Sequence, residues 1–300
     1  MYLDKRVNSA TVLTGLIGNP LGHTVSPQLH NSLFRRMGIN GIYLPLQVEK
    51  PKLGEAVKGL SSLGFAGFNV TIPYKVAVLD YVDEVSEYVK LLGTANTIKV
   101  KDGRLCAYNT DADGFFDAFV IQTGTDFKSK NVCILGAGGT ARAIAIKIAM
   151  EGAERISIIN RTEIKAEELA SYINDIVQYK AQKADVAYAC SSCSPEAAES
   201  LKQCDIIVNT TSVGMYPNVS VSPLSDEFIF NKDQIVCDVI YKPGRTKLLK
   251  MAESCGCKSI NGAGMLFYQG VRAFETFMDT KVPYNIADNL SKDFFNFIEA

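Results

Sequence analysis

One short stretch, residues 131–145, constrains the fold of this chain more than any other part of the sequence. Residues 132–135 form an apolar run that is long enough for a buried strand and too short for a helix. Gly136, Gly138 and Ala141 follow on a G-x-G-x-x-A spacing, and small and apolar residues then continue in a helical pattern. These small residues permit a tight turn, a close approach of the backbone to a pyrophosphate, and close packing of helix on strand. We therefore predict an α/β fold with a Rossmann-like dinucleotide-binding domain.

The composition describes an ordinary globular chain. Its 300 residues suggest about two domains, and 47% of them are hydrophobic and 21% charged. The net charge of -1 gives no electrostatic reason to expect nucleic acid or an acidic membrane as a partner. No apolar run approaches the roughly 20 residues that span a bilayer, and the first ten residues contain no apolar signal core. We expect a cytoplasmic protein.

The cysteines and histidines do not predict a metal site. Two cysteine pairs, Cys190/Cys193 and Cys255/Cys257, have a spacing that can serve metal or redox chemistry. The only histidines, His23 and His30, are far from both pairs in the sequence. We therefore expect unpaired thiols and no metal.

Polar residues gather where the predicted strands of the first 110 residues end. Residues 13–18 read as a strand, and Thr24 and Ser26 follow on a loop that leads into a helix, with Ser26 as its predicted N-cap. Two explanations are open for these hydroxyls: they cap the helix and form the turn, or they bind a carboxylate. Thr71 and Lys75 lie at or beyond the end of a strand over residues 65–71, with a helix expected after them. Ligands of open α/β sheets bind at this edge, although a lone lysine there is typically a solvated surface residue.

The second half of the chain has its own polar strand ends. A strand over residues 155–159 ends in Asn160, Arg161 and Thr162, with Lys165 one helical turn later. This position lies about 20 residues beyond the glycine turn, where an NAD-binding fold places an acid on the ribose 2′-hydroxyl. A guanidinium suits a 2′-phosphate instead, so the pattern favours NADP. An exposed basic turn is the alternative, and Glu163 keeps NAD open.

Two later segments complete the predicted site. The strand that starts at residue 205 runs into a loop of small polar residues up to residue 214, which we expect beside the nicotinamide half of the cofactor. A strand over residues 235–241 follows. From residue 265 the apolar spacing predicts a long amphipathic helix, whose apolar face Gln269 interrupts.

Taken together, seven of these motifs resemble the shikimate dehydrogenase family, in family order from about residue 14 to 285. They are Gly18-Asn-Pro-Leu-x-His-Thr-x-Ser-Pro27, Asn69-Val-Thr-Ile-Pro-x-Lys75, Gly93-x-Ala-Asn-Thr97, Asn109-Thr-Asp111, Gly136-Ala-Gly-Gly-Thr-Ala141, Asn160-Arg-Thr162, and Gly262-x-Gly-Met-Leu266 with Gln269. The resemblance implies NADPH-dependent, reversible reduction of 3-dehydroshikimate to shikimate, on the chorismate pathway to aromatic amino acids.

The resemblance also implies roles for individual residues. Lys75 and Asp111 match the catalytic pair; Lys75 would stabilise the negative charge on the ketone oxygen and supply a proton, or act by charge alone. Substrate binding falls to both of these residues and to Thr24, Ser26, Thr71, Asn96, Tyr241 and Gln269. Cofactor binding falls to Gly136, Ala137, Gly138, Gly139, Thr140, Ala141, Asn160, Arg161, Thr162, Lys165 and Gly262.

Two departures from the family pattern leave alternatives open. Thr24 stands where the family usually has serine, and Lys165 stands where a second arginine is common. A quinate/shikimate dehydrogenase that uses NAD or both cofactors is therefore a rival reading, and a non-catalytic metabolite sensor is a second one. We expect a substrate domain formed by residues 1–111 and 261–300, a cofactor domain formed by residues 112–260, and a monomer or homodimer.

Overall fold

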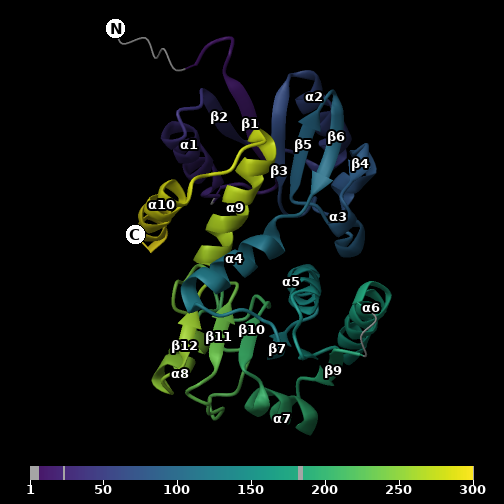
Figure 1. The fold of residues 1–300 in the computed structure, drawn as a ribbon, viewed down its shortest axis with the longest axis vertical. Helices are drawn as coiled ribbons and strands as arrows, with labels where there is room; N and C mark the ends of the chain where they lie inside the picture. Colours follow the sequence, from purple (N-terminus) through teal and green to yellow (C-terminus); the bar gives the residue numbers. More distant parts are fainter. Residues whose placement is uncertain (1–6, 23, 182–184, 300) are drawn as a thin grey trace. The chain divides into compact units, whose positions relative to one another are not determined.

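A computed structural model of the chain describes residues 7–22, 24–181 and 185–299. The chain forms two compact units (Figure 1). The first contains the residues up to Thr110 together with Phe267–Ile298, and the second contains Asp111–Leu266. Both units are α/β structures, so the predicted fold class is confirmed. His23 of the first motif lies outside the described residues.

The first unit is built on a mixed six-stranded sheet in the order β2-β1-β3-β5-β6-β4. Its strands are β1 (Val12–Gly18), β2 (Gly41–Gln47), β3 (Phe65–Val70), β4 (Glu84–Val85), β5 (Thr97–Lys101) and β6 (Arg104–Tyr108). Its helices are α1 (Ser26–Arg36), α2 (Leu53–Ser62), α3 (Glu87–Leu92), α10 (Tyr284–Glu299) and most of α9 (Ala263–Met278), with 3-10 turns η1 (Lys50–Lys52) and η2 (Ala77–Tyr81). β1 pairs in parallel with β2 and β3, so these three strands bring their carboxyl ends to one edge.

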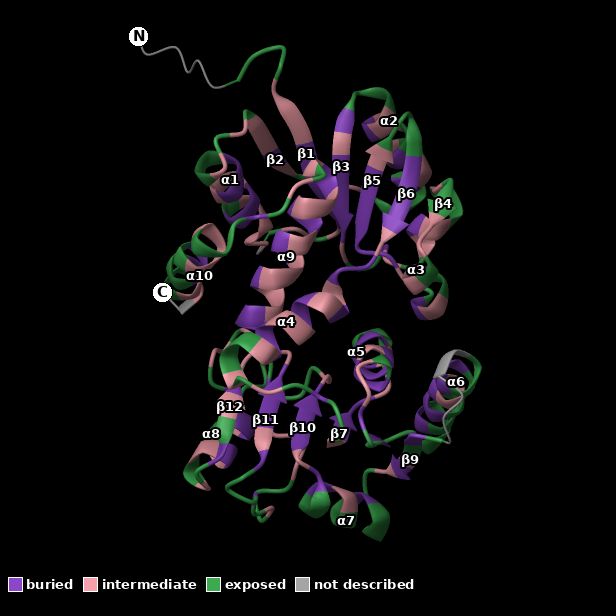
Figure 2. Cartoon of the chain, viewed as in Figure 1, coloured by how far each residue is buried: buried purple, intermediate pink, exposed green. Residues whose placement is uncertain are grey.

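The two faces of this sheet are covered by different helices. Side chains of α2, η2 and α3 pack with the buried faces of β1, β3, β5 and β6 in one apolar cluster. On α9, the Phe277 ring would clash with any Cβ at Gly67 of β3, and Phe274 meets Phe34 of α1 edge-on at 5.0 Å. Figure 2 shows the central strands of the sheet as largely buried. Their carboxyl ends are therefore held on a rigid core.

The second unit contains a fully parallel sheet in the order β12-β11-β10-β7-β8-β9. The strands are β7 (Asn131–Leu135), β8 (Arg155–Asn160), β9 (Ala187–Ser191), β10 (Ile206–Asn209), β11 (Ile235–Asp238) and β12 (Lys258–Ile260), and the helices are α4 (Asp111–Thr123), α5 (Gly139–Met150), α6 (Glu163–Ala181), α7 (Pro195–Gln203) and α8 (Lys247–Ser254). The chain order reverses between β7 and β10, which is the switch point where doubly wound sheets bind dinucleotides.

Most predicted elements are present, and two local predictions are wrong. Ser26 is the first residue of α1 and not its cap, because Val25 occupies the N-cap position, where no side chain caps the helix. The single helix expected after Lys75 is instead the short turn η2, the two-residue strand β4 and α3, which Ser86 caps. No helix within the described residues is long and apolar enough to cross a membrane.

Candidate functional site

The glycine turn after β7 has the geometry that its sequence predicts. Gly136 has a φ of 109°, and a Cβ there would lie 2.8 Å from Thr210 Oγ1 and 3.0 Å from Thr211 Cγ2. Both the backbone conformation and the lack of space therefore require glycine. The amide of Gly136 donates to the carbonyl of Ile159 on β8, at 2.8 Å. This bond fixes the turn at the carboxyl edge of the sheet.

The N-terminus of α5 is open to a ligand. Gly138 is the N-cap and makes no side-chain capping bond, and a Cβ at Gly138 or Gly139 would meet no atom within 4 Å. Thr140 is exposed beside them, whereas Ala141 is fully buried against the sheet. Uncapped amides and the positive end of the helix dipole suit the pyrophosphate of a dinucleotide. The residues present therefore fit the predicted cofactor.

The turn after β8 carries the predicted basic residues. Asn160 Nδ2 donates to the carbonyl of Thr162 at 2.8 Å, and the amide of Lys165 donates to the same carbonyl at 3.2 Å. This turn leads directly into α6 and leaves Arg161 and Lys165 exposed. Within the described part of the chain, neither cation forms an ion pair. They are available for a phosphate group.

Two buried polar residues, which the sequence reading did not single out, lie at the ends of β10 and β11. Asn209 is fully buried and Asp238 is 2% exposed, and the two residues are paired in the parallel register. Asn209 Nδ2 donates to Asp238 Oδ1 at 3.1 Å. Both residues end apolar runs at the edge where ligands bind, and that position was the available signal.

Tyr241 and Gly262 follow β11 and β12 in this same unit. The amide of Gly262 donates to the carbonyl of Ile240 at 3.0 Å, and a Cβ on Gly262 would lie only 2.0 Å from the carbonyl oxygen of Val239. Glycine is therefore the only residue that permits this approach. Tyr241, next to Ile240, is half-buried.

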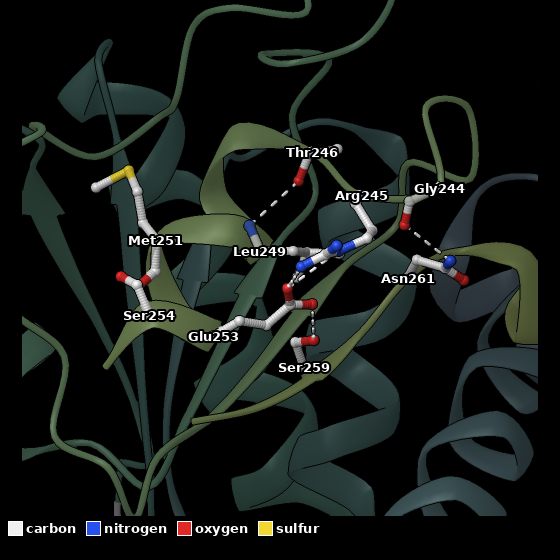
Figure 3. A network of polar contacts seen from close by, with 9 residues as sticks. All are labelled: Gly244, Arg245, Thr246, Leu249, Met251, Glu253, Ser254, Ser259 and Asn261. Carbon is white, nitrogen blue, oxygen red and sulfur yellow. Dashed lines mark hydrogen bonds and ion pairs between the residues drawn. The ribbon is translucent and has the colours of Figure 1, made fainter. Parts of the chain in front are cut away.

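The segment between Tyr241 and Gly262 is tied together by polar contacts, which Figure 3 shows. Asn261 Nδ2 donates to the carbonyl of Gly244 at 2.9 Å. Outside the view of the figure, Asn261 Oδ1 also accepts from the amide of Ala263 at 3.0 Å. Arg245 pairs with Glu253, which also accepts from Ser259. These bonds hold the start of α9 against the loop that follows β11.

Asn96 is the centre of a buried polar cluster in the first unit. Its side chain is 3% exposed; Oδ1 accepts from the amide of Thr110 at 2.9 Å and from the hydroxyl of Thr97 at 2.8 Å. Its Nδ2 is 3.0 Å from Thr110 Oγ1 and 3.4 Å from Gln269 Oε1. The structure therefore brings the predicted substrate residues Asn96 and Gln269 together, from positions 173 residues apart in sequence.

Thr71 and Lys75 stand at the carboxyl end of β3, beside this cluster. The amide of Thr71 donates to the carbonyl of Ile17 on β1 at 2.9 Å, and the carbonyl of Lys75 accepts from the amide of Ala95 at 2.8 Å. Both residues are half-buried. Their backbone is therefore fixed at the predicted ligand edge.

Thr24 and Ser26 are also placed in the first unit, near a tyrosine that the sequence reading missed. Thr24 Oγ1 accepts from the amide of Ser26 at 3.3 Å, and the Ser26 side chain hydrogen-bonds the Tyr43 hydroxyl. Tyr43 is 1% exposed and donates to Asn69 Oδ1 at 2.8 Å. Burial raises the pKa of this hydroxyl well above its ordinary value, and the bond with Ser26 partly opposes that shift. No local signal in β2 marks Tyr43 as polar-bonded.

Asn69 completes the connection between Tyr43 and Asn96. Its Nδ2 donates to the carbonyl of Asn96 and to Thr97 Oγ1, both at 3.0 Å. The first unit thus gathers Thr24, Ser26, Thr71, Lys75, Asn96 and Gln269, and the second gathers the glycine turn, the basic turn, Tyr241 and Gly262 with Asp111 at its first residue.

Among the residues that the structure describes, the cysteines do not take part in a metal centre. All eight are free thiols, and six of them are buried. No group of three histidine, cysteine, aspartate or glutamate residues that could hold a metal ion occurs within residues 7–22, 24–181 and 185–299.

Known proteins match both units. The family model of the shikimate dehydrogenase substrate binding domain matches residues 16–98, and that of shikimate / quinate 5-dehydrogenase matches residues 120–216. An NADP(+) shikimate dehydrogenase of Methanopyrus kandleri is 40% identical over 286 residues, which are 95% of this chain and 97% of that protein. The chain belongs to the shikimate dehydrogenase family.

Two crystal structures extend this result to the fold. A shikimate dehydrogenase in complex with NADP+ superimposes with a TM-score of 0.85 at 38% identity, and the match covers 96% of each chain. The Listeria monocytogenes shikimate 5-dehydrogenase in complex with shikimate and NAD has a TM-score of 0.87 at 33% identity, and covers 97% of this chain and 99% of that one. The predicted family is therefore confirmed.

Proposed function

We propose that this protein is an NADPH-dependent shikimate dehydrogenase, which reversibly reduces 3-dehydroshikimate to shikimate on the pathway to chorismate and aromatic amino acids. The observation that carries the proposal is the 40% identity to an NADP(+) shikimate dehydrogenase over 95% of the chain. The open glycine turn and the exposed Arg161 and Lys165 support NADPH as the cofactor. A monomer or homodimer in the cytoplasm stays the prediction for its assembly and location.

The proposed chemistry assigns the catalytic roles to Lys75 and Asp111. NADPH, when bound, supplies a hydride to the carbonyl carbon of the substrate. Lys75 hydrogen-bonds the carbonyl oxygen, stabilises the charge that develops there, and donates the proton that makes the hydroxyl. Asp111 orients Lys75 in this proposal. These roles of Lys75 and Asp111 are supported by the match of both residues to the family motifs.

The remaining substrate groups are assigned in the same way. Thr24 and Ser26 bind the carboxylate, while Thr71, Asn96 and Gln269 bind ring hydroxyls and Tyr241 borders the ring. The support from the structure is that Asn96 and Gln269 lie within 3.4 Å of each other, and that Ser26 reaches the same network through Tyr43. Hydrogen bonds from a pre-organised polar cluster favour one orientation of a polyhydroxylated ring.

A quinate/shikimate dehydrogenase is the second candidate, because the matching family model includes both activities and a structural relative binds NAD. The test is a two-by-two assay of nicotinamide absorbance, with shikimate or quinate against NADP⁺ or NAD⁺. Turnover mainly with shikimate and NADP⁺ is the expected result. Comparable quinate turnover, or a preference for NAD⁺, would favour the second candidate. A lack of turnover in all four combinations would favour a metabolite sensor on the same fold.

Lys75→Ala tests whether Lys75 acts on the reacting oxygen. We expect turnover to fall by at least about a thousandfold while shikimate still binds, because the variant loses both the charge and the proton at the reacting oxygen. Lys90→Ala is the matched control, because Lys90 is an exposed lysine of α3 whose ammonium group pairs with Glu87 at the surface. Near-normal turnover of Lys75→Ala would contradict the mechanism.

A further inference from the structure

The strand ends of β10 and β11 contain a buried polar pair that the proposed reaction does not use directly. Asp238 accepts three hydrogen bonds: Oδ1 accepts from Asn209 Nδ2 at 3.1 Å and from the amide of Ile240 at 3.0 Å, and Oδ2 accepts from the hydroxyl of Thr246 at 2.8 Å. All three partners are donors, so they match an ionised carboxylate, which can only accept. Burial raises the pKa of Asp238 and these hydrogen bonds oppose the shift.

Asn209 connects this pair to the dinucleotide turn. Its Oδ1 accepts from the amide of Thr211 at 3.0 Å and from the Thr211 hydroxyl at 2.7 Å. Thr211 Cγ2 stands 3.0 Å from where a Cβ on Gly136 would lie. Asn209 therefore sets the conformation of the loop after β10. This loop packs on Gly136, the first glycine of the turn.

Asp238 connects the pair to the opposite loop. It fixes the amide of Ile240, whose carbonyl accepts from the amide of Gly262 at 3.0 Å. The carbonyl of Asn209 also accepts from the amide of Val239 at 3.0 Å. One pair of buried side chains thus determines the path of both segments that follow β10 and β11.

We propose that Asn209 and Asp238 are positioning residues, which hold the two loops of the second unit that flank the nicotinamide half of the cofactor. This inference rests on the proposed function, because it assigns the loops to a nicotinamide. Neither residue touches substrate or cofactor in the proposal. Their effect is on the angle and distance at which hydride transfer takes place.

The amide of Asn209 is essential to this arrangement, because it donates to Asp238 and accepts from Thr211 at the same time. Asn209→Asp places two carboxylates about 3.1 Å apart. Two carboxyl groups at this separation ionise in two steps, so the pair shares one proton at low pH, and at high pH it loses that proton and the two charges repel each other. A shared proton restores a hydrogen bond in the position of the lost N–H. The variant therefore makes the loop geometry dependent on pH.

No other charged group interferes with this titration among the residues described. The groups that hydrogen-bond Asp238 belong to Asn209, Ile240 and Thr246, which do not titrate. The adjacent thiol of Cys237 has its pKa raised by burial and by Asp238. The two flanking cations of Thr246 are paired elsewhere, Arg245 with Glu253 and Lys247 with Asp226.

The experiment compares the wild-type enzyme with Asn209→Asp, Asn209→Ala and Ser157→Ala. Ser157 is 2% exposed on β8 of the same sheet and is a control for disturbing a buried polar side chain. For each protein we would measure kcat with shikimate and NADP⁺ from pH 6 to 9, affinity for 2′,5′-ADP and for NADP⁺ by calorimetry, and the melting temperature. The probe 2′,5′-ADP contains the adenosine half of the cofactor and lacks the nicotinamide.

We expect kcat of Asn209→Ala to fall at least about tenfold at every pH, with affinity for 2′,5′-ADP within about twofold of wild type. The kcat of Asn209→Asp should equal that of Asn209→Ala at pH 9. At pH 6 it should be close to the kcat of wild type at the same pH. The kcat and the 2′,5′-ADP affinity of Ser157→Ala should stay within about twofold of wild type at every pH. The inference would be overturned if the ratio of kcat between Asn209→Asp and wild type were constant from pH 6 to 9. It would also be overturned if the variants lost 2′,5′-ADP affinity and kcat to the same extent.

Failure of the proposed function gives a different result. If the wild-type protein does not turn over shikimate, the proposed function is wrong whatever the variants do. The positioning role is then judged on binding alone: a loss of NADP⁺ affinity in Asn209→Asp that grows with pH, with 2′,5′-ADP affinity unchanged, supports it. Unchanged NADP⁺ affinity in both Asn209 variants contradicts it.

Discussion

His30 makes the first unit sensitive to acid. Its imidazole is 1% exposed on α1 and stacks on the Tyr43 ring, with centroids 4.0 Å apart and planes 10° apart. The Phe274 and Phe277 rings lie at 6.3 and 6.1 Å, and His30 Nδ1 has no hydrogen-bond partner among the described residues. A protonated ring at this position loses its hydration without gaining an acceptor. Burial accordingly lowers the pKa of His30 from 6.5 to about 3.

The sign and the size of the effect follow from this pKa. Because the folded pKa is below the unfolded value, the unfolded chain binds more protons between about pH 3 and pH 6.5. The free energy of unfolding is therefore undiminished above pH 6.5 and decreases as the pH falls below it. At pH 5.0, which is 1.5 units below the unfolded pKa, the loss from His30 alone is about 2 kcal/mol.

His30→Phe removes the titration and keeps an aromatic ring on Tyr43. Unfolding by urea, followed by circular dichroism because the chain has no tryptophan, would be measured at pH 7.5 and pH 5.0 for both proteins. Other groups titrate equally in the two proteins, so their contributions cancel. Between pH 7.5 and pH 5.0, we expect the free energy of unfolding to decrease by about 2 kcal/mol more in wild type than in His30→Phe.

NMR provides an independent readout, because the chain contains only two histidines. The imidazole signal that disappears in His30→Phe should show no titration above pH 5 in the folded wild-type protein. If that signal titrates near pH 6.5, or if both proteins lose the same free energy of unfolding between pH 7.5 and 5.0, the burial argument is wrong.

Three further substitutions test other parts of the site. Tyr43→Phe removes the donor to Asn69 and should cost about 1–2 kcal/mol of stability and raise KM for shikimate more than it lowers kcat; an unchanged KM would separate Tyr43 from the substrate residues. Gly262→Ala places a methyl group 2.0 Å from the Val239 carbonyl oxygen, so thermal denaturation should show a loss of several kcal/mol, and a melting temperature equal to wild type would refute the close approach. Arg161→Ala should raise KM for NADP⁺ at least about tenfold with little effect on NAD⁺, and equal effects on both would remove the 2′-phosphate argument.

Features that depend on local backbone requirements were predictable from sequence. The glycine turn after β7 was identified because Gly136 and Gly138 leave a pattern that any strand-to-helix turn of this type needs. The turn between the antiparallel strands β5 and β6 has the same kind of local cause, because its two residues, Asp102 and Gly103, both have positive φ values, 50° and 77°, and Asp-Gly is a typical hairpin pair. In each case the cause and the sequence signal are within a few residues of each other.

Features that depend on distant partners were not predictable. The strand order that places β10 beside β7, and the arrangement of η2, β4 and α3 after Lys75, depend on packing against elements elsewhere in the chain. Tyr43 stands inside an apolar strand, where its neighbours suggest only burial, whereas the position of Asp238 at the end of β11 is a signal in itself. The Tyr43 hydroxyl donates to Asn69, 26 residues away, and Asn209 donates to Asp238, 29 residues away, so no pattern within one strand identifies either pair.

In each unit, a buried asparagine at a strand end holds a neighbouring loop in place. Asn96 in the first unit and Asn209 in the second each accept from the amide of a following segment, Thr110 at 2.9 Å and Thr211 at 3.0 Å, and each donates through Nδ2 to a neighbouring side chain. A carboxylate cannot donate and a hydroxyl cannot span both partners, so only an amide of this length satisfies both groups. An unsatisfied buried polar group costs about 1–3 kcal/mol, and the loops at these strand ends would be free to take other conformations. Asparagine at a buried strand end is therefore a mark of a loop whose position matters, and it points to the loops beside Asn96 and Asn209 as the parts of this chain that must be held in one place.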